Sequence, residues 1–212
     1  MFRFPSLAVG LAVALAPAAF AGDGNSLDLL QISSGALGNA LYLDMEGARG
    51  ARVAGDAAGL LPASQIGSGN RADVTITGSG GQLALMQNNA LSGLGLGNSA
   101  EAVISGLYGT GSIQQIGDGN VAALNLASPD ALNPASGSIL QTGMANSGAL
   151  TVRGAGASGL LVQVGSGNSN ALTVEGAGTT ASYTQIGNNA VNPQGATVVS
   201  NGGSVAITQY SF

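Results

Sequence analysis

The sequence has 212 residues, of which 36 are glycine and only 7% are charged, with a formal net charge of −5 and no cysteine or histidine. Globular domains usually carry about 25% charged residues, and without His or Cys the common acid–base, thiol and zinc sites of enzymes are excluded. The apolar share of 45% is still enough to bury a core, which argues against disorder. We therefore expect a folded, non-enzymatic protein that needs no cofactor, and its acidity predicts no nucleic acid partner.

Residues 1–21 show the three-part pattern of a secretory signal peptide. Arg3 precedes an apolar run over residues 7–16, Pro17 interrupts that run, and Ala19-Phe20-Ala21 matches a cleavage site. A run of about ten residues is too short to cross a bilayer, which takes about 20. The pattern predicts a secreted chain that starts near residue 22 and does not insert into a membrane. Because that chain has no cysteine, backbone pairing and packing must stabilise it outside the cell.

Residues 22–212 form one repetitive domain of about seven repeats and a terminal half repeat. Four clear copies read QIGSGN at 65–70, QIGDGN at 115–120, QTGMAN at 141–146 and QVGSGN at 163–168. More divergent copies cover 31–39, 87–98 and 185–189, and a last Gln stands at position 209. The basic step is 22 residues, lengthened in places by loops. A fixed period of this length predicts a repeat architecture.

Apolar and polar residues alternate within each repeat, which is typical of strands with one buried face. The apolar positions that follow each Asn include Leu43, Val74, Leu124, Leu150 and Leu172. The positions between them carry charge at Asp73, Glu101 and Glu175. Each repeat therefore reads as a strand, a Gly-rich turn and a second strand, and such a unit buries its inner face only by stacking on its neighbours. The pattern predicts an all-β solenoid with two stacked parallel sheets, in a cross-β arrangement able to form amyloid.

The same parity places the repeated Gln and Asn side chains inside the solenoid. A buried amide without a partner costs about 1–3 kcal/mol, but identical amides stacked in register can hydrogen-bond along a column. We expect two amide columns that also guide assembly. Their members are Gln31, Gln65, Gln87, Gln115, Gln141, Gln163, Gln185, Gln209, Asn39, Asn70, Asn98, Asn120, Asn146, Asn168 and Asn189.

The repeat resembles that of the curlins, whose pattern is Ser, four residues, Gln, one residue, Gly, two residues, Asn, one residue and Ala. Ser136 and Ser158 stand five residues before a Gln, Gly143 two residues after one, and Ala72 and Ala122 two residues after an Asn. The resemblance covers almost all of residues 22–212. It implies a secreted structural subunit that self-assembles into extracellular curli-like amyloid fibres at the cell surface, as a pilus or fimbrium does, for biofilm matrix, adhesion and surface attachment.

The resemblance also implies partners. They are further copies of the chain, other curlin subunits or a nucleator, an outer-membrane secretion pore and periplasmic helpers. Curlin repeats often carry another Gln late in the second strand, where this chain has residues such as Ile76 and Val152. This departure leaves open whether the chain is a major subunit or a nucleator.

Two other repeat classes are alternatives. A monomeric secreted β-solenoid adhesin or ice-binding protein should carry a flat ladder of identical outward residues and capped ends, whereas the outward Thr residues are irregular and the last half repeat has no cap. A calcium-binding β-roll needs an Asp in each Gly-rich turn, and only Asp118 meets that need. Arg71 and Asp73, two residues apart on one strand, are expected to form a surface ion pair.

Overall fold

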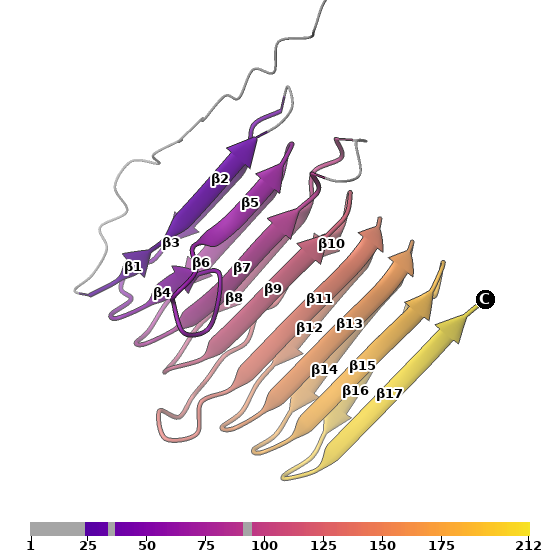
Figure 1. The fold of residues 1–212 in the computed structure, drawn as a ribbon. Helices are drawn as coiled ribbons and strands as arrows, with labels where there is room; N and C mark the ends of the chain where they lie inside the picture. Colours follow the sequence, from indigo (N-terminus) through magenta and orange to yellow (C-terminus); the bar gives the residue numbers. More distant parts are fainter. Residues whose placement is uncertain (1–23, 34–36, 91–94) are drawn as a thin grey trace, which may run out of the picture.

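The computed structural model describes residues 24–33, 37–90 and 95–212, so the expected signal peptide at 1–21 lies outside the described residues. The chain forms the predicted all-β solenoid of about seven rungs, in which each rung adds one strand to each of two parallel sheets (Figure 1). The described part contains no helix long and apolar enough to span a membrane.

The larger sheet, here called sheet A, has ten strands stacked in chain order. Two of its layers are split in two: β1 and β2 share the first layer, and β4 and β5 share the second. The strands are β1 (Ser26–Leu27), β2 (Leu29–Ser33), β4 (Arg52–Ala54), β5 (Ala63–Gly67), β7 (Gln82–Asn88), β9 (Thr110–Ile116), β11 (Ser136–Met144), β13 (Ser158–Ser166), β15 (Thr180–Gly187) and β17 (Ser204–Ser211).

The second sheet, sheet B, has seven strands and lies behind sheet A in Figure 1. Its strands are β3 (Ala40–Asp44), β6 (Arg71–Ile76), β8 (Ser99–Ile104), β10 (Val121–Ala122), β12 (Ser147–Val152), β14 (Ser169–Glu175) and β16 (Ala196–Val199). All neighbouring strands in both sheets are parallel, and equivalent repeat positions pair with each other, as Leu150 does with Leu172. Stacking in register turns each inward position into a column of like side chains.

The core between the sheets confirms the predicted alternation of inward and outward side chains. Val74, Leu124, Leu150 and Leu172 are buried, while Leu43, in the first rung with a neighbour on one side only, is half-buried and packs against the core. The charged side chains on the alternate positions, Asp73, Glu101 and Glu175, lie on the outer surface. One face of each strand therefore fills the core and the other meets solvent.

Strand β10 ends after Ala122, although the alternation predicts that the strand continues to Leu126. Asn125, Leu126 and Ala127 have φ values of 73°, 86° and 57°, so the backbone leaves the extended conformation here. Leu124 and Leu126 are buried nonetheless. The apolar column is thus kept where the hydrogen-bonded ladder is lost, which shows that side-chain packing holds this segment in place.

The first long insertion is shorter than the sequence suggests. Residues 46–62 read as an extended loop, but β4 forms inside this range and pairs with β1 and β7. Val53 and Ala54 are buried, so the strand covers the core beside the first rung. Residues 46–51 form the turn that leads into β4, and the part from Gly55 to Pro62 remains a loop, which a hydrogen bond from Gly55 N to Leu61 O closes.

The Gly-rich turns require glycine because successive turns stack closely. Gly143 has a φ of 115°, and a Cβ atom there would lie 2.0 Å from the carbonyl oxygen of Gly165 in the next turn. Both the positive φ and the close approach exclude larger residues. The glycines of the repeat therefore set the layer spacing at this edge of the solenoid.

Candidate functional site

The glutamine column runs through the core from the first layer of sheet A to the last. In every step the Nε2 of one Gln donates to the Oε1 of the next. The distances are 2.7 Å from Gln65 to Gln87, 2.8 Å from Gln87 to Gln115, 2.9 Å from Gln115 to Gln141, 2.8 Å from Gln141 to Gln163, 2.9 Å from Gln163 to Gln185 and 3.1 Å from Gln185 to Gln209. Gln31 donates to Gln65 in the same sense. The column therefore has a direction, because every Nε2 donor points toward the C-terminal end.

The second Nε2 proton of each internal Gln joins the two sheets. Gln115, for example, donates to the carbonyl of Asn120 in its own rung at 3.0 Å and to that of Ser99 in the preceding rung at 2.9 Å. Gln141 donates to the carbonyl of Val121 at 2.7 Å. Since these side chains are fully buried, the bonds satisfy groups that would otherwise be costly to desolvate.

The asparagine column lies at the turns, beside the glutamines. The Oδ1 of each Asn accepts hydrogen bonds from the next Asn in the stack, as Asn98 does from both the backbone N and the Nδ2 of Asn120, at 3.0 and 3.1 Å. The Nδ2 of Asn120 also donates to the carbonyl of Gly143 at 2.9 Å. The column runs from Asn39 to Asn168, and each member ties the turns of adjacent rungs together.

The predicted last member of this column, Asn189, is not part of it. Asn189 is exposed with a φ of 56°, and buried Ala190 takes the inward place, its backbone N donating to Oδ1 of Asn168 at 3.0 Å. In the four clear copies the Asn stands three residues after the Gly of the motif, and the residue three after Gly187 is Ala190. The column therefore ends one rung earlier than predicted, because alanine has no amide to continue it.

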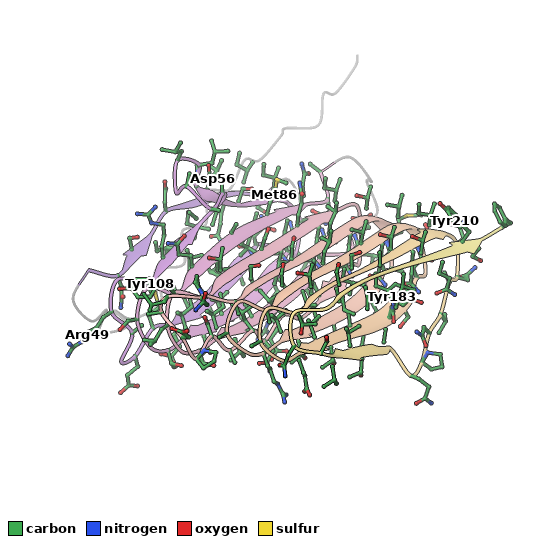
Figure 2. The ribbon with its side chains drawn as sticks, turned by 90° about the horizontal axis from the view of Figure 1, so that it is seen from below. Arg49, Asp56, Met86, Tyr108, Tyr183 and Tyr210 are labelled. Atoms are coloured by element: carbon green, nitrogen blue, oxygen red, sulfur yellow. The ribbon has the colours of Figure 1, made fainter. Side chains whose placement is uncertain are left out.

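The structure also buries polar groups outside the two amide columns; the alternation placed Asn170 on the inward face, as observed. Asn89, in the insertion after β7, accepts from the backbone N of Ser68 and donates to its carbonyl, and so replaces part of a missing turn. Asn170 lies inward on β14 with its Nδ2 unpaired, and Tyr183 lies inward on β15 with its hydroxyl donating to Oε1 of Gln209 at 2.9 Å. Figure 2 shows Tyr183 pointing into the layer between the sheets. These contacts arise only when neighbouring rungs are placed in space.

Asp118 is the most unusual buried group. It is 1% exposed, and within the part of the chain that the structure describes neither of its carboxylate oxygens has a hydrogen-bond partner. The corresponding positions of the motif hold Ser68 and Ser166. Among the described residues no group of three or more His, Cys, Asp or Glu could hold a metal ion. This turn therefore buries a carboxylate without a described hydrogen-bond donor, which opposes folding.

Among the described residues, most charged side chains lie on or beside sheet B and the first layers of sheet A, and Asp118 and Asp130 are the exceptions. Arg71 and Asp73 form the expected exposed ion pair at 2.8 Å on β6, and this bonding raises the pKa of Arg71 above its ordinary value. The guanidinium also lies 4.8 Å from the ring centre of Tyr42 on β3. Arg153 and Glu175 make a second surface pair at 3.5 Å. Such exposed pairs contribute little to stability, and they keep sheet B well hydrated.

The two ends of the solenoid carry complementary unpaired groups. At the N-terminal end, Oε1 of Gln31 accepts no hydrogen bond within the described residues. At the C-terminal end, Nε2 of Gln209 donates none, although its Oε1 accepts from Gln185. The edge strands β1, β2 and β17 are likewise open on one side. The unpaired acceptor and open strand edge at the N-terminal end thus match the unpaired donor and open strand edge at the C-terminal end.

Compared with models of known protein families, with curated proteins and with solved structures, the chain matches none of them.

Proposed function

We propose that this chain is a secreted structural subunit that self-assembles end to end into extracellular curli-like amyloid fibres. Such fibres would serve biofilm matrix, adhesion and surface attachment, with further copies of the chain, a nucleating subunit and an export pore with periplasmic helpers as partners. The supporting observation is the match between the ends: the free Nε2 of Gln209 and the free Oε1 of Gln31 would continue the glutamine column from one molecule into the next.

The edge strands favour the same joint. β17 can pair with β1 and β2 of the next molecule as it pairs with β15, because Ser204, Val205 and Ile207 repeat the alternation seen at Ser26, Leu27 and Leu29. Neither edge carries proline or lysine, the residues that proteins commonly use to block edge pairing. A contact between unlike ends does not close on itself, so it extends into an open filament.

The joint would form mainly through sheet A. Sheet A has one layer more than sheet B, since β17 has no following strand, and Figure 1 shows it alone at the C-terminal end. When β17 pairs with the first layer of the next molecule, sheet B has a gap the width of one strand between β16 and β3 of that next molecule. The glutamine column and the sheet A ladder therefore supply most of the contact.

The double substitution Gln31→Leu and Gln209→Leu tests this function. Each joint would lose an amide bond worth about 0.5–1.5 kcal/mol, so the concentration needed for growth should rise at least about two- to ten-fold. The terminal rungs of each molecule would also lose the bonds to Gln65 and Gln185. Fibre growth is followed by thioflavin fluorescence and electron microscopy, and circular dichroism checks that the chain stays folded. Gln114→Leu, a half-buried outward Gln on β9, is the control and should grow as the wild type does. Equal growth of the double variant would show that these ends do not form the joint.

A further inference from the structure

The outer face of sheet A from β7 to β17 carries no charge. We call this surface the sheet A face, and it consists of the outward side chains of β7, β9, β11, β13, β15 and β17. It contains no Asp, Glu, Lys or Arg. The outer side of sheet B, in contrast, carries Arg71, Asp73, Glu101 and Glu175. Figure 2 shows Met86 and Tyr210 on the sheet A side of the molecule. The two faces of one solenoid therefore meet water with very different chemistry.

The middle of the sheet A face carries a cluster of apolar side chains in register, set among Ser, Thr and Gln side chains of the same strands. Leu140 pairs with Val162 across β11 and β13, and Val164 pairs with Ile186 across β13 and β15. Leu160, Val164 and Ile186 remain 40%, 39% and 38% exposed. Contiguous exposed apolar residues of this kind mark interaction surfaces on soluble proteins.

We propose that the sheet A face packs against the same face of a second copy of this chain, so that solenoids pair side by side. The inference goes beyond end-to-end growth, although pairing of whole fibres rests on the proposed function. Columns repeated about every 4.8 Å on both partners can interdigitate, with the two sheets about 10 Å apart. A self-complementary patch of this type gives a two-fold contact.

The size of the face fits a stable contact. Six layers span ~29 Å along the stack, and about seven residues span ~23 Å along each strand, so the footprint is ~650 Å² per copy. Stable interfaces bury about 800 Å² per partner, and the corrugated surface adds to the flat footprint. Pairing through sheet B would instead remove water from the charged side chains of Arg71, Asp73, Glu101 and Glu175, which is costly.

The loop from Gly55 to Pro62 sets one limit of the face. Asp56 lies on the same side of the molecule as Met86 in Figure 2. Its Oδ1 accepts from the backbone N of Leu60, which is 80% exposed. The loop stands between β4 and β5, so a flat contact begins at β7.

Val162→Lys tests the proposal. Val162 is half-buried on β13 and lies in the middle of the face, between Leu140 and Thr184. Its outward position lets a lysine reach solvent, so the fold should persist. Thr173→Lys on β14, in the same rung but on sheet B, is the matched control. Fibre width is measured by electron microscopy, and the association of the soluble mature chain by sedimentation velocity.

Wild-type and Thr173→Lys fibres should be two solenoids wide, and Val162→Lys fibres one solenoid wide with elongation within about two-fold of wild type. Sedimentation should show a dimer whose dissociation constant rises at least about ten-fold in Val162→Lys. Single-width wild-type fibres, or paired Val162→Lys fibres, would overturn the proposal. If no fibre forms, the end-to-end function fails, and sedimentation alone decides the pairing: a monomer at every concentration overturns it. A monomeric wild type that inhibits ice recrystallisation would assign the face to ice instead.

Discussion

Replacement of Gln141 by Leu probes the amide column inside one molecule, apart from assembly. Gln141 is fully buried, donates to Oε1 of Gln163 at 2.8 Å and to the carbonyl of Val121 at 2.7 Å, and accepts from Gln115 at 2.9 Å. Leucine fills a similar volume but makes none of these bonds. Within the described residues, Oε1 of Gln163 would then have no donor at all.

The expected cost follows from those partners. An unsatisfied buried amide oxygen costs about 1–3 kcal/mol, and each lost hydrogen bond about 0.5–1.5 kcal/mol, with part of this offset by the more apolar leucine. We expect the free energy of unfolding to fall by about 2–4 kcal/mol. Gln115 would be affected less than Gln163, because its Nε2 still donates to the carbonyls of Ser99 and Asn120.

Urea unfolding of a chain that begins at residue 22, followed by circular dichroism at concentrations where it stays monomeric, measures this change. Gln114→Leu, adjacent to Gln115 but outward on β9, should alter stability by less than about 0.5 kcal/mol. If Gln141→Leu also falls within 0.5 kcal/mol of the wild type, the buried column contributes little and the reasoning is wrong.

Three further predictions concern the turns and the end of the asparagine column. Gly143→Ala should destabilise the chain by more than about 2 kcal/mol in urea unfolding, because its Cβ would meet the next carbonyl, whereas Gly38→Ala, where nothing lies within 4 Å, should be nearly neutral. Asp118→Ser should stabilise by about 1–3 kcal/mol, since it removes an unpaired buried carboxylate; equal or lower stability would contradict this. Ala190→Asn should extend the column from Asn168 and raise the thermal midpoint, and a lower midpoint would show that the site has no room for the amide.

The sequence predicted those features that depend on local parity. Alternation along one strand decides which side chains face inward, so residues such as Leu150 and Gln141 could be assigned without knowledge of the fold. The repeat also predicted the stacking, because an isolated strand-turn-strand unit has no partner for its inner face. The alternation alone did not predict how many residues separate the Gln from the inward position after the turn. The assignment therefore went to the nearest Asn, Asn189, when the inward residue is Ala190.

Other features depend on contacts between rungs and could not be read from one repeat. Strand β4 forms because Val53 and Ala54 are buried against the core of the first layers, and nothing in the glycine-rich range 46–62 marks it as a strand. The paired roles of Tyr183 and Gln209 arise across adjacent layers. The common direction of the hydrogen bonds in the glutamine column also depends on the whole stack, since a single amide can point either way until its neighbours fix it.

Fibre diffraction, with electron cryo-microscopy of the same fibres, tests end-to-end assembly most directly. The account predicts a meridional reflection near 4.8 Å from strands perpendicular to the fibre axis. It also predicts an axial repeat of ~38 Å for eight sheet A layers per subunit, and density that continues from Gln209 of one subunit to Gln31 of the next. Soluble monomers under all assembly conditions, or fibres whose subunits do not meet through these two residues, would contradict it.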